Sequence, residues 1–412
     1  MTHSVSGREA RQLGASGPSG HALDLVRSAL DVAELLVQHV IRPAQQQANP
    51  PDFTKEVGEV AMLLRLADRV LVREADQGRI AVLAWRVSRL ARSRSTRTAV
   101  AARPSRAAAH VLAHGCLHQL GCRDDAFDEL ARTALTSSAA NACERVPYRL
   151  LDVAWIRHLL LGDAELDHPA LEVSPIAAGV DLVGATVEDA YAFSHALPYA
   201  TDFGRLPLPP SVDTAWLSQI TDALVLKALH EDDLDLLGEL LMAPALLRQD
   251  WSPVQWFGWR VLCDTWAQYG FVPGPGLPPP VEGEDSVETV RRVLGTVYHT
   301  TLVGGLAVAT LVSAGRLPAP TPPMGPRCEV PEVDPTDDSR AWLRTWHTLY
   351  LDEREALGAV PAGIALHSAV DATDVVAIVE SLNSPSVVAL PEPLVTQAAE
   401  LVNRLALLVG AS

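Results

Sequence analysis

The chain has 412 residues and a formal net charge of −17, and 48% of its residues are hydrophobic. This acidic balance argues against nucleic-acid binding as the main task, because contact with phosphates needs a basic face. No apolar run reaches the roughly 18 uncharged residues that suggest a membrane-spanning helix, so we expect a cytoplasmic protein without membrane contact. The five cysteines lack paired spacing, which predicts reduced thiols instead of a disulfide framework.

Residues 1–20 are polar and rich in glycine and serine, which predicts a disordered tail. From residue 21 onward apolar residues recur three or four positions apart, the spacing of a buried helical stripe, and strand-like alternation is nearly absent. The basic stretch 86–106 is interpreted as a solvated helix end and loop. We expect helices near 21–40, 54–74, 76–93, 104–121, 123–138, 145–162, 187–200, 212–230, 232–243, 252–269, 285–314, 339–357, 371–383 and 392–409.

These elements predict an all-α fold in which antiparallel helical hairpins form an α/α toroid-like ring or an open solenoid. The closed ring is favoured because the segment 285–314 is apolar on most sides after its first turns, as an inner helix would be. Prolines gather in the connectors 206–210, 273–280 and 318–335, where their fixed φ precludes a helix. The predicted organisation is a tail (1–20), a main helical domain (21–317), a proline-rich linker (318–336) and a C-terminal helical cap (337–412).

The segment AAAHVLAHGCLHQLGC at 107–122 contains a stripe of potential metal ligands. His110, His114, His118 and Cys122 recur every four residues and therefore share one slowly rotating helix face. Neutral imidazoles and a thiolate bind zinc or iron. The segment lacks the glutamate of the His-Glu-x-x-His pattern, so ordinary packing of these histidines, or one catalytic histidine at His114, stays open beside a metal site.

The segment DAYAFSHALPYATDFG at 189–204 offers a candidate general base. Tyr191, His195, Tyr199 and Asp202 fall near one helix face, with Pro198 as a possible kink. A carboxylate at Asp202 that orients His195 would give a base tuned near neutral pH. The alternative is that Asp202 caps the turn at Gly204 while His195 bonds a backbone carbonyl.

Two further groups complete the candidate site. Tyr298 and His299 lie in TVYHTT, inside the most apolar predicted helix, where a buried imidazole needs a hydrogen-bond partner. Glu144 and Arg149, in ERVPYRLLD, place charges at the start of another helix. We predict that Tyr191, Tyr199, Tyr298, Glu144 and Arg149 bind substrate.

The segment SHALPYATDFG (194–204) resembles the THAL-aromatic-aromatic-x-TDFG segment of an uncharacterised, mainly actinobacterial family of helical proteins. Weaker similarity at LAHGCLHQLG, ERVPYRLLD, DLDLLGELL and YHTT extends the resemblance over about residues 105–315. The chain departs from the pattern at Ser194 and Pro198. The resemblance implies an accessory or tailoring protein of specialised metabolism, and it implies no particular reaction.

Two functions remain open. The first is a small-molecule enzyme whose centre collects His114, His195, His299 and Asp202 for acid–base or metal-assisted cyclisation, isomerisation, elimination or hydrolysis. The second is a non-catalytic helical scaffold or regulator that binds a peptide or partner protein along a groove. The acids in HEDDLDLLGEL suggest a terpene cyclase only weakly, because their spacing is not Asp-Asp-x-x-Asp. The sequence specifies no substrate, cofactor, metal or oligomeric state.

Overall fold

The computed structural model describes residues 18–44, 52–162, 169–275, 286–319 and 340–410. Every regular element in these ranges is helical, which confirms the all-α prediction. The predicted tail lies outside the described residues up to residue 17, after which α1 begins. Most of the predicted linker also lies outside them, so the division into domains stays a prediction.

The first half of the chain contains α1 (Pro18–Leu35), η2 (Leu36–Ile41), α2 (Arg42–Ala44), α3 (Thr54–Val70), α4 (Glu74–Ala91), α5 (Arg94–Ala102), η3 (Pro104–Arg106), α6 (Ala107–Gln119), α7 (Asp125–Thr136), α8 (Ser138–Asn141), α9 (Pro147–Leu161), α10 (Pro175–Ala178) and α11 (Val187–Thr201). The second half contains α12 (Thr214–Glu231), α13 (Leu234–Leu240), α14 (Ala243–Leu246), α15 (Pro253–Tyr269), α16 (Ser286–Ser313), α17 (Ala341–Thr348), α18 (Leu351–Ala356), α19 (Ala359–Asp371), α20 (Val375–Asn383), η4 (Pro385–Ala389) and α21 (Glu392–Gly410).

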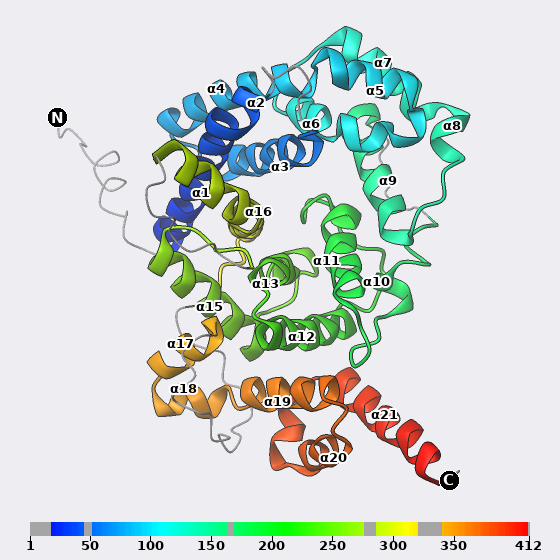
Figure 1. Ribbon diagram of the computed structural model, residues 1–412, viewed down its shortest axis with the longest axis vertical. Helices are drawn as coiled ribbons and strands as arrows, with labels where there is room; N and C mark the ends of the chain where they lie inside the picture. Colours follow the sequence, from blue (N-terminus) through cyan, green and yellow to red (C-terminus); the bar gives the residue numbers. More distant parts are fainter. Residues whose placement is uncertain (1–17, 45–51, 163–168, 276–285, 320–339, 411–412) are drawn as a thin grey trace, which may run out of the picture.

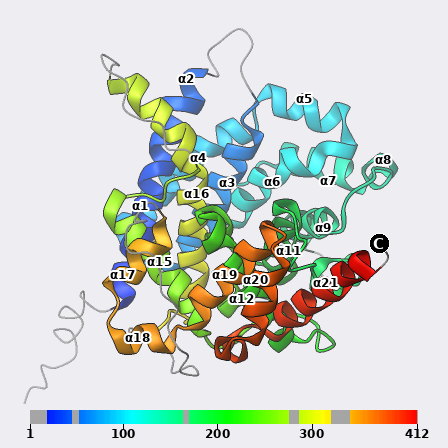
Figure 2. The ribbon, with the colours of Figure 1, turned by 60° about the horizontal axis from the view of Figure 1, so that its bottom comes forward.

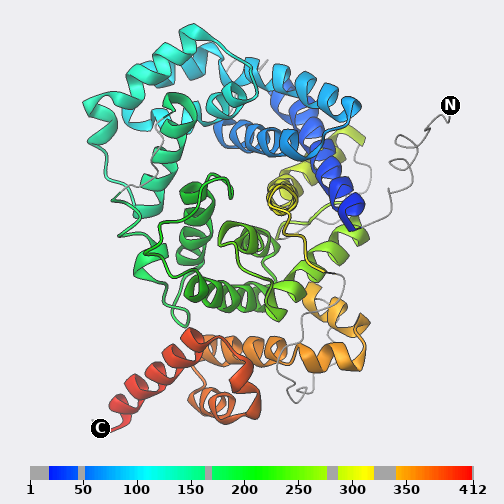
Figure 3. The same cartoon turned by 180° about the vertical axis from the view of Figure 1, so that it is seen from behind.

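The helices from α1 to α16 follow a closed path (Figure 1). α16 returns to the beginning of the chain and packs along α1 and α3. α13 lies inside this path and contacts α11, α12 and α16, and the view from behind shows the same enclosed position (Figure 3). The chain therefore closes on itself instead of winding into an open solenoid, whereas the regular double ring of an α/α toroid stays a prediction.

Two glycines allow α16 to approach its neighbours closely. A Cβ atom at Gly305 would lie 2.5 Å from Cβ of Ala29 on α1, and one at Gly304 would lie 2.8 Å from the ring of Trp266 on α15. Both distances are shorter than any normal van der Waals contact, so the close packing of α16 requires residues without a side chain. By length and composition Val287–Ser313 could cross a membrane, but most of it is buried inside the protein, as in the core helix of a soluble protein.

Helices α17 to α21 form a layer against α12 and α15, and this layer comes forward in Figure 2. The ion pair between His230 Nε2 and Asp371 Oδ2, 2.9 Å apart, joins α12 to α19. Asp232 Oδ1 accepts the amide hydrogen of Ala341 at 2.9 Å and so fixes the start of α17. Asp232 therefore has a structural role at this junction.

Some predicted boundaries were wrong for local reasons. The stretch taken as a helix end and loop contains α5, because the Ser93 side chain accepts the amide hydrogen of Thr96 and begins a new helix. The predicted helix at 339–357 is broken into α17 and α18, because Tyr350 is extended and its amide donates to Glu353 at 2.8 Å. α19 was not predicted, although Pro361 lies in its first turn, where its missing amide is not needed.

Candidate functional site

Acidic and imidazole side chains from four helices meet around α13. His195 Nε2 lies 2.9 Å from Glu239 Oε1, and the Ser194 hydroxyl donates to the other oxygen of Glu239. His299 lies between two carboxylates, with Nε2 3.0 Å from Asp235 Oδ2 and Nδ1 3.0 Å from Glu59 Oε2. We call this group the central cluster: Glu59 of α3, Tyr191, Ser194 and His195 of α11, Asp235 and Glu239 of α13, and His299 of α16.

The local sequence explains why α13 presents two acids to the same side. Asp233 begins the helix, because its carboxylate accepts the amide hydrogens of Asp235 at 3.1 Å and Leu236 at 3.0 Å. Asp235 and Glu239 are four residues apart and therefore lie on one face, one turn from each other. All seven residues of α13 are buried, so both carboxylates depend on protein partners for their stabilisation.

α11 supplies the opposite side of the cluster. A capping box of Thr186 and Asp189 fixes the start of this helix, and Tyr191, His195 and Tyr199 then follow at intervals of four residues. The ring centroids of Tyr191 and Tyr199 lie 5.7 and 6.3 Å from that of His195. Tyr148 of α9 adds a third ring at 5.6 Å. The predicted stripe on this helix is thus present, and it surrounds His195 with tyrosines.

The two histidines of the central cluster have raised pKa values. Burial opposes protonation of His299, but the contacts with Asp235 and Glu59 outweigh burial and raise the pKa of its imidazole to about 10. Burial also opposes protonation of His195, and Glu239 raises its pKa above the ordinary value. His299 is therefore an imidazolium at neutral pH, whereas His195 titrates above its ordinary range.

The cluster also retains unused hydrogen-bonding capacity. Three buried atoms have no hydrogen-bond partner within the described part of the chain: His195 Nδ1, Glu59 Oε2 and Asp235 Oδ1. The 3.0 Å contact between Glu59 Oε2 and His299 Nδ1 is an ion pair. The side chains of His195 and His299 nevertheless keep 29% of their surface exposed. Each of the two side chains is therefore partly accessible from solvent.

Asp202 does not take the predicted place beside His195, which Glu239 occupies. Its carboxylate is 1% exposed, accepts from Arg65 Nη2 at 2.7 and 2.8 Å, and accepts from Trp155 Nε1 at 2.8 Å. Asp202 has a left-handed backbone with φ of 47°, and the Thr201 hydroxyl accepts the amide hydrogen of Gly204 at 3.2 Å. The Thr-Asp-Phe-Gly segment is therefore a turn that ends α11 and anchors it to α3 and α9.

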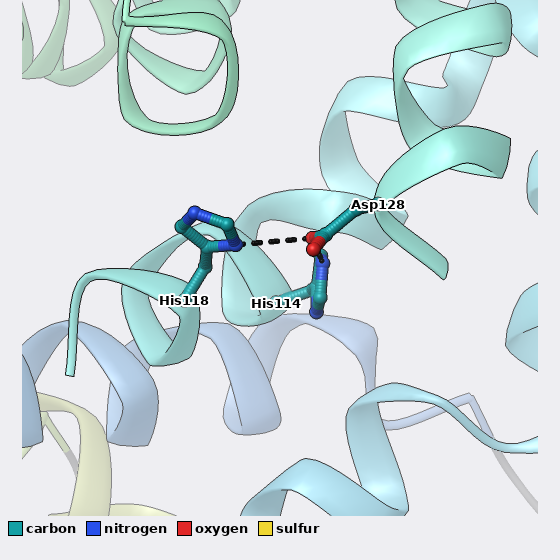
Figure 4. Close-up of side chains that lie close together, drawn as sticks. All are labelled: His114, His118 and Asp128. Carbon is teal, nitrogen blue, oxygen red and sulfur yellow. Dashed lines mark hydrogen bonds and ion pairs between the residues drawn. The ribbon is translucent and has the colours of Figure 1, made fainter. Parts of the chain in front are cut away.

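His114 also has partners outside the central cluster. Its Nε2 lies 2.6 Å from Asp128 Oδ1, and His118 Nδ1 lies 3.0 Å from the same oxygen (Figure 4). Arg92 Nε donates to His114 Nδ1 at 3.0 Å, and burial lowers the pKa of this imidazole to about 4. His195 and His299 each pair with a carboxylate of α13, so a common pocket for these two histidines stays a prediction, whereas His114 belongs to a separate group with Arg92, His118 and Asp128.

The remaining predicted binding residues are divided between the cluster and the surface. The ring of Tyr298 lies 6.2 Å from that of His299, and its hydroxyl bonds to Glu56 of α3. Arg149 stacks over Tyr148 at 4.9 Å, at the edge of the ring of tyrosines. Glu144 is exposed in the loop before α9 and lies outside the cluster.

Glu59 and Glu239 were not predicted as site residues, and Asp235 was considered only as part of a terpene-cyclase motif. A signal was present, because both segments, EVGEVAML and DLDLLGELL, place acids inside otherwise apolar helical stretches. Buried acids need partners, and such positions therefore deserve the same weight as buried histidines. Tyr148 carried no comparable signal, since tyrosines at helix starts are common.

The sequence of this chain matches the model of one protein family. The family model described as "Domain of unknown function (DUF6895)" matches residues 21–309, more than half of the chain. The chain belongs to this uncharacterised family. The match includes every residue of the central cluster and ends within α16, ten residues beyond His299. No curated protein and no solved structure matches the chain.

Proposed function

We propose that this member of the DUF6895 family is a small-molecule enzyme that transfers protons at the central cluster. The observation that carries the proposal is the Glu239–His195 pair, in which Nε2 is held by a buried carboxylate at 2.9 Å while Nδ1 has no partner in the described chain. A carboxylate that fixes one imidazole nitrogen leaves the other to accept or donate a proton. His195 is the proposed proton-transfer residue, and Glu239 is its positioning residue.

His299 has a different proposed role, because an imidazolium with a pKa of about 10 releases its proton poorly at neutral pH. It provides a fixed positive charge that holds Asp235 and Glu59 and can stabilise an oxyanion formed on the substrate. The reaction classes that need only these groups are isomerisation, elimination, cyclisation and hydrolysis. The resemblance to the actinobacterial family favours a tailoring role in specialised metabolism, in the cytoplasm.

The cluster further favours a substrate with a positively charged, hydrogen-bond-donating group, such as an ammonium. Asp235 Oδ1 is an acceptor without a hydrogen-bond donor within the described chain, and Glu59 Oε2 has His299 as its only charged partner there. Tyrosine rings near His195 also stabilise cations through their faces. An organic cation satisfies these acceptors from several directions at once.

An unbiased search for the substrate tests the proposal. The full chain is incubated with a bacterial metabolite extract in D2O, and compounds that gain deuterium at carbon or change mass are followed by mass spectrometry. His195→Gln and Glu239→Gln are expected to reduce the rate at least about 100-fold, as is usual for loss of a general base. His230→Gln is the matched control, because His230 forms an ion pair of the same 2.9 Å length with Asp371, away from the cluster.

Equal rates in wild type and His195→Gln would overturn the proposed mechanism. If the extract is unchanged by the wild type, and the protein instead retains a peptide or protein from the same extract, the scaffold function replaces the enzyme. Far-ultraviolet circular dichroism of each variant confirms that the helices are intact. Loss of helicity in His195→Gln would likewise contradict the assignment, because a partly exposed catalytic side chain should be replaceable.

A further inference from the structure

The group formed by His114, His118 and Asp128 is separate from the proposed active site and has its own chemistry. His114 and His118 lie on successive turns of α6, and Asp128 reaches them from α7 (Figure 4). His114 Nε2, His118 Nδ1 and one carboxylate oxygen all lie within 4.8 Å of one another. In the part of the chain that the structure describes, no other three histidine, cysteine or acidic side chains bring their ligand atoms together in this way.

We propose that His114, His118 and Asp128 bind a divalent transition-metal ion such as zinc. Two imidazole nitrogens and one carboxylate oxygen form a donor set that suits zinc or ferrous iron and leaves at least one coordination position for water. The present nitrogen–oxygen distances of 2.6 and 3.0 Å are those of direct hydrogen bonds. Small side-chain rotations would widen them to the separation of two ligands around one ion.

The exposure of the three residues is compatible with entry of an ion from solvent. The side chain of His114 is fully buried, whereas those of His118 and Asp128 keep 14% and 16% of their surface exposed. Phe127 packs against the His114 ring, with centroids 4.5 Å apart, and limits its rotation. One ligand is therefore fixed in place, and the other two form the open side of the site.

The other histidine of the stripe lies outside the site. His110 Nδ1 lies 3.1 Å from the Thr54 hydroxyl of α3, one turn before His114. Cys122 takes part through its backbone, whose carbonyl accepts from Arg92. Of the histidine stripe that the sequence suggested as a metal site, only His114 and His118 belong to the proposed site. The third ligand is Asp128, which the sequence analysis did not include.

Arg92 competes with the metal. Its Nε donates to His114 Nδ1, so in the metal-free protein the imidazole proton lies on Nε2 and is donated to Asp128. A metal bound at Nε2 displaces this proton to Nδ1, where it meets the Arg92 N–H, and the Arg92–His114 hydrogen bond is lost. The guanidinium keeps its bonds to the carbonyls of Cys122 and Arg123, so it need not leave the site entirely. Replacing Arg92 by a side chain that accepts a hydrogen bond from the Nδ1–H of His114 should therefore tighten metal binding.

The test uses the full chain, freed of metal by dialysis, with Co²⁺ as a spectroscopic probe and Zn²⁺ in calorimetry. We expect one ion per chain. His118→Ala and Asp128→Asn should each weaken binding at least about 100-fold, whereas His110→Ala, the matched control on the same helix, should leave it unchanged. Arg92→Gln should tighten binding about tenfold, the scale on which a residue that contacts a ligand changes metal affinity.

Absence of Co²⁺ absorption bands, or binding that His118→Ala does not weaken, would overturn the metal site. Weaker metal binding by Arg92→Gln would contradict the proposal that Arg92 competes with the metal, but it would not contradict the three proposed ligands. Circular dichroism of the metal-free variants separates lost ligation from lost folding. His118 and Asp128 are chosen for substitution because both are partly exposed, so their replacement disturbs the core less than replacement of His114.

Discussion

Asp202 and His195 lie seven residues apart near the same face of α11, yet their surroundings differ. The Asp202 carboxylate is closed from solvent, and Arg65 and Trp155 donate to it. In the central cluster, two turns away, the two histidine side chains are partly exposed, and His195 Nδ1 and Asp235 Oδ1 are buried without hydrogen-bond partners in the described chain. A charged group with a complete set of partners holds helices together, whereas an incomplete set leaves capacity for a ligand. The two regions are linked, because Trp155 also stacks on Tyr199 at 5.2 Å.

The largest expected effect is a loss of stability when Asp202, the residue that anchors the end of α11, is replaced. Asp202→Asn leaves the buried Arg65 without its counter-charge and should reduce the free energy of unfolding by about 3–5 kcal/mol. Urea denaturation measures the change. Arg205→Gln is the control, because Arg205 is 57% exposed at 3.3 Å from the same carboxylate, and an exposed pair contributes less than about 1 kcal/mol. A loss as small for Asp202→Asn as for the control would mean that Asp202 does not anchor α11.

A second effect concerns the central cluster alone and depends on pH. The imidazole of His299 has a pKa of about 10 in the folded protein against 6.5 for the free side chain, so the folded state binds its proton more tightly. This stabilisation is fully present below pH 6.5 and is lost as the pH rises towards 10. We expect the loss to be on the order of a few kcal/mol in urea denaturation across this range.

Glu59→Gln and His299→Gln should both flatten this pH dependence, because each removes one member of the ion pair. Arg205→Gln should leave it unchanged, since a guanidinium keeps its charge throughout this pH range. A wild-type stability that is constant or increasing between pH 6.5 and 10 would contradict the charged state assigned to His299.

The smallest expected effect tests how Ser194 supports the Glu239–His195 pair. Ser194 donates to Glu239, and removal of this donor in Ser194→Ala makes the carboxylate a stronger partner for the imidazolium. The pKa of His195 should rise by a few tenths of a unit, which nuclear magnetic resonance of the ring protons can detect. Ser194→Thr, which restores the residue of the related THAL segment, should keep the wild-type value. A lower pKa in Ser194→Ala would show that the hydroxyl does not act through Glu239.

Much of the fold followed from helical periodicity, because long amphipathic helices such as α1, α3 and α21 repeat their apolar residues over several turns. That His195 and His299 each have polar partners was also predictable, since imidazoles in apolar helices need them. Their partners were not predictable, because Glu59 and Glu239 come from helices distant in sequence. Local spacing suggested Asp202 instead, and the left-handed turn at its position carries the carboxylate towards Arg65.

The assignment of His114 failed for a related reason. In sequence it looks like His299, as a histidine in an apolar helix, but their neighbours leave one imidazole neutral and the other positively charged. Burial keeps the His114 imidazole neutral, whereas two carboxylates keep His299 protonated. Since Arg92, Asp128, Glu59 and Asp235 all belong to other helices, only the packing of those helices decides which histidine is charged.

The return of α16 to α1 and α3 has a consequence for the order of events during protein synthesis. More than half of the chain separates Glu59 from His299, so the ribosome releases one partner of this ion pair long before it makes the other. Until α16 emerges, α1 lacks its main partner, α3 packs against α6 and α4 without α16, and the carboxylate of Glu59 has only Lys55 as a charged partner. The residues of α1 and α3 that α16 covers have no such cover before it is made, and contacts of such high sequence separation form slowly. A chain cut short before α16 would therefore carry His195 and Glu239 without the imidazolium of His299.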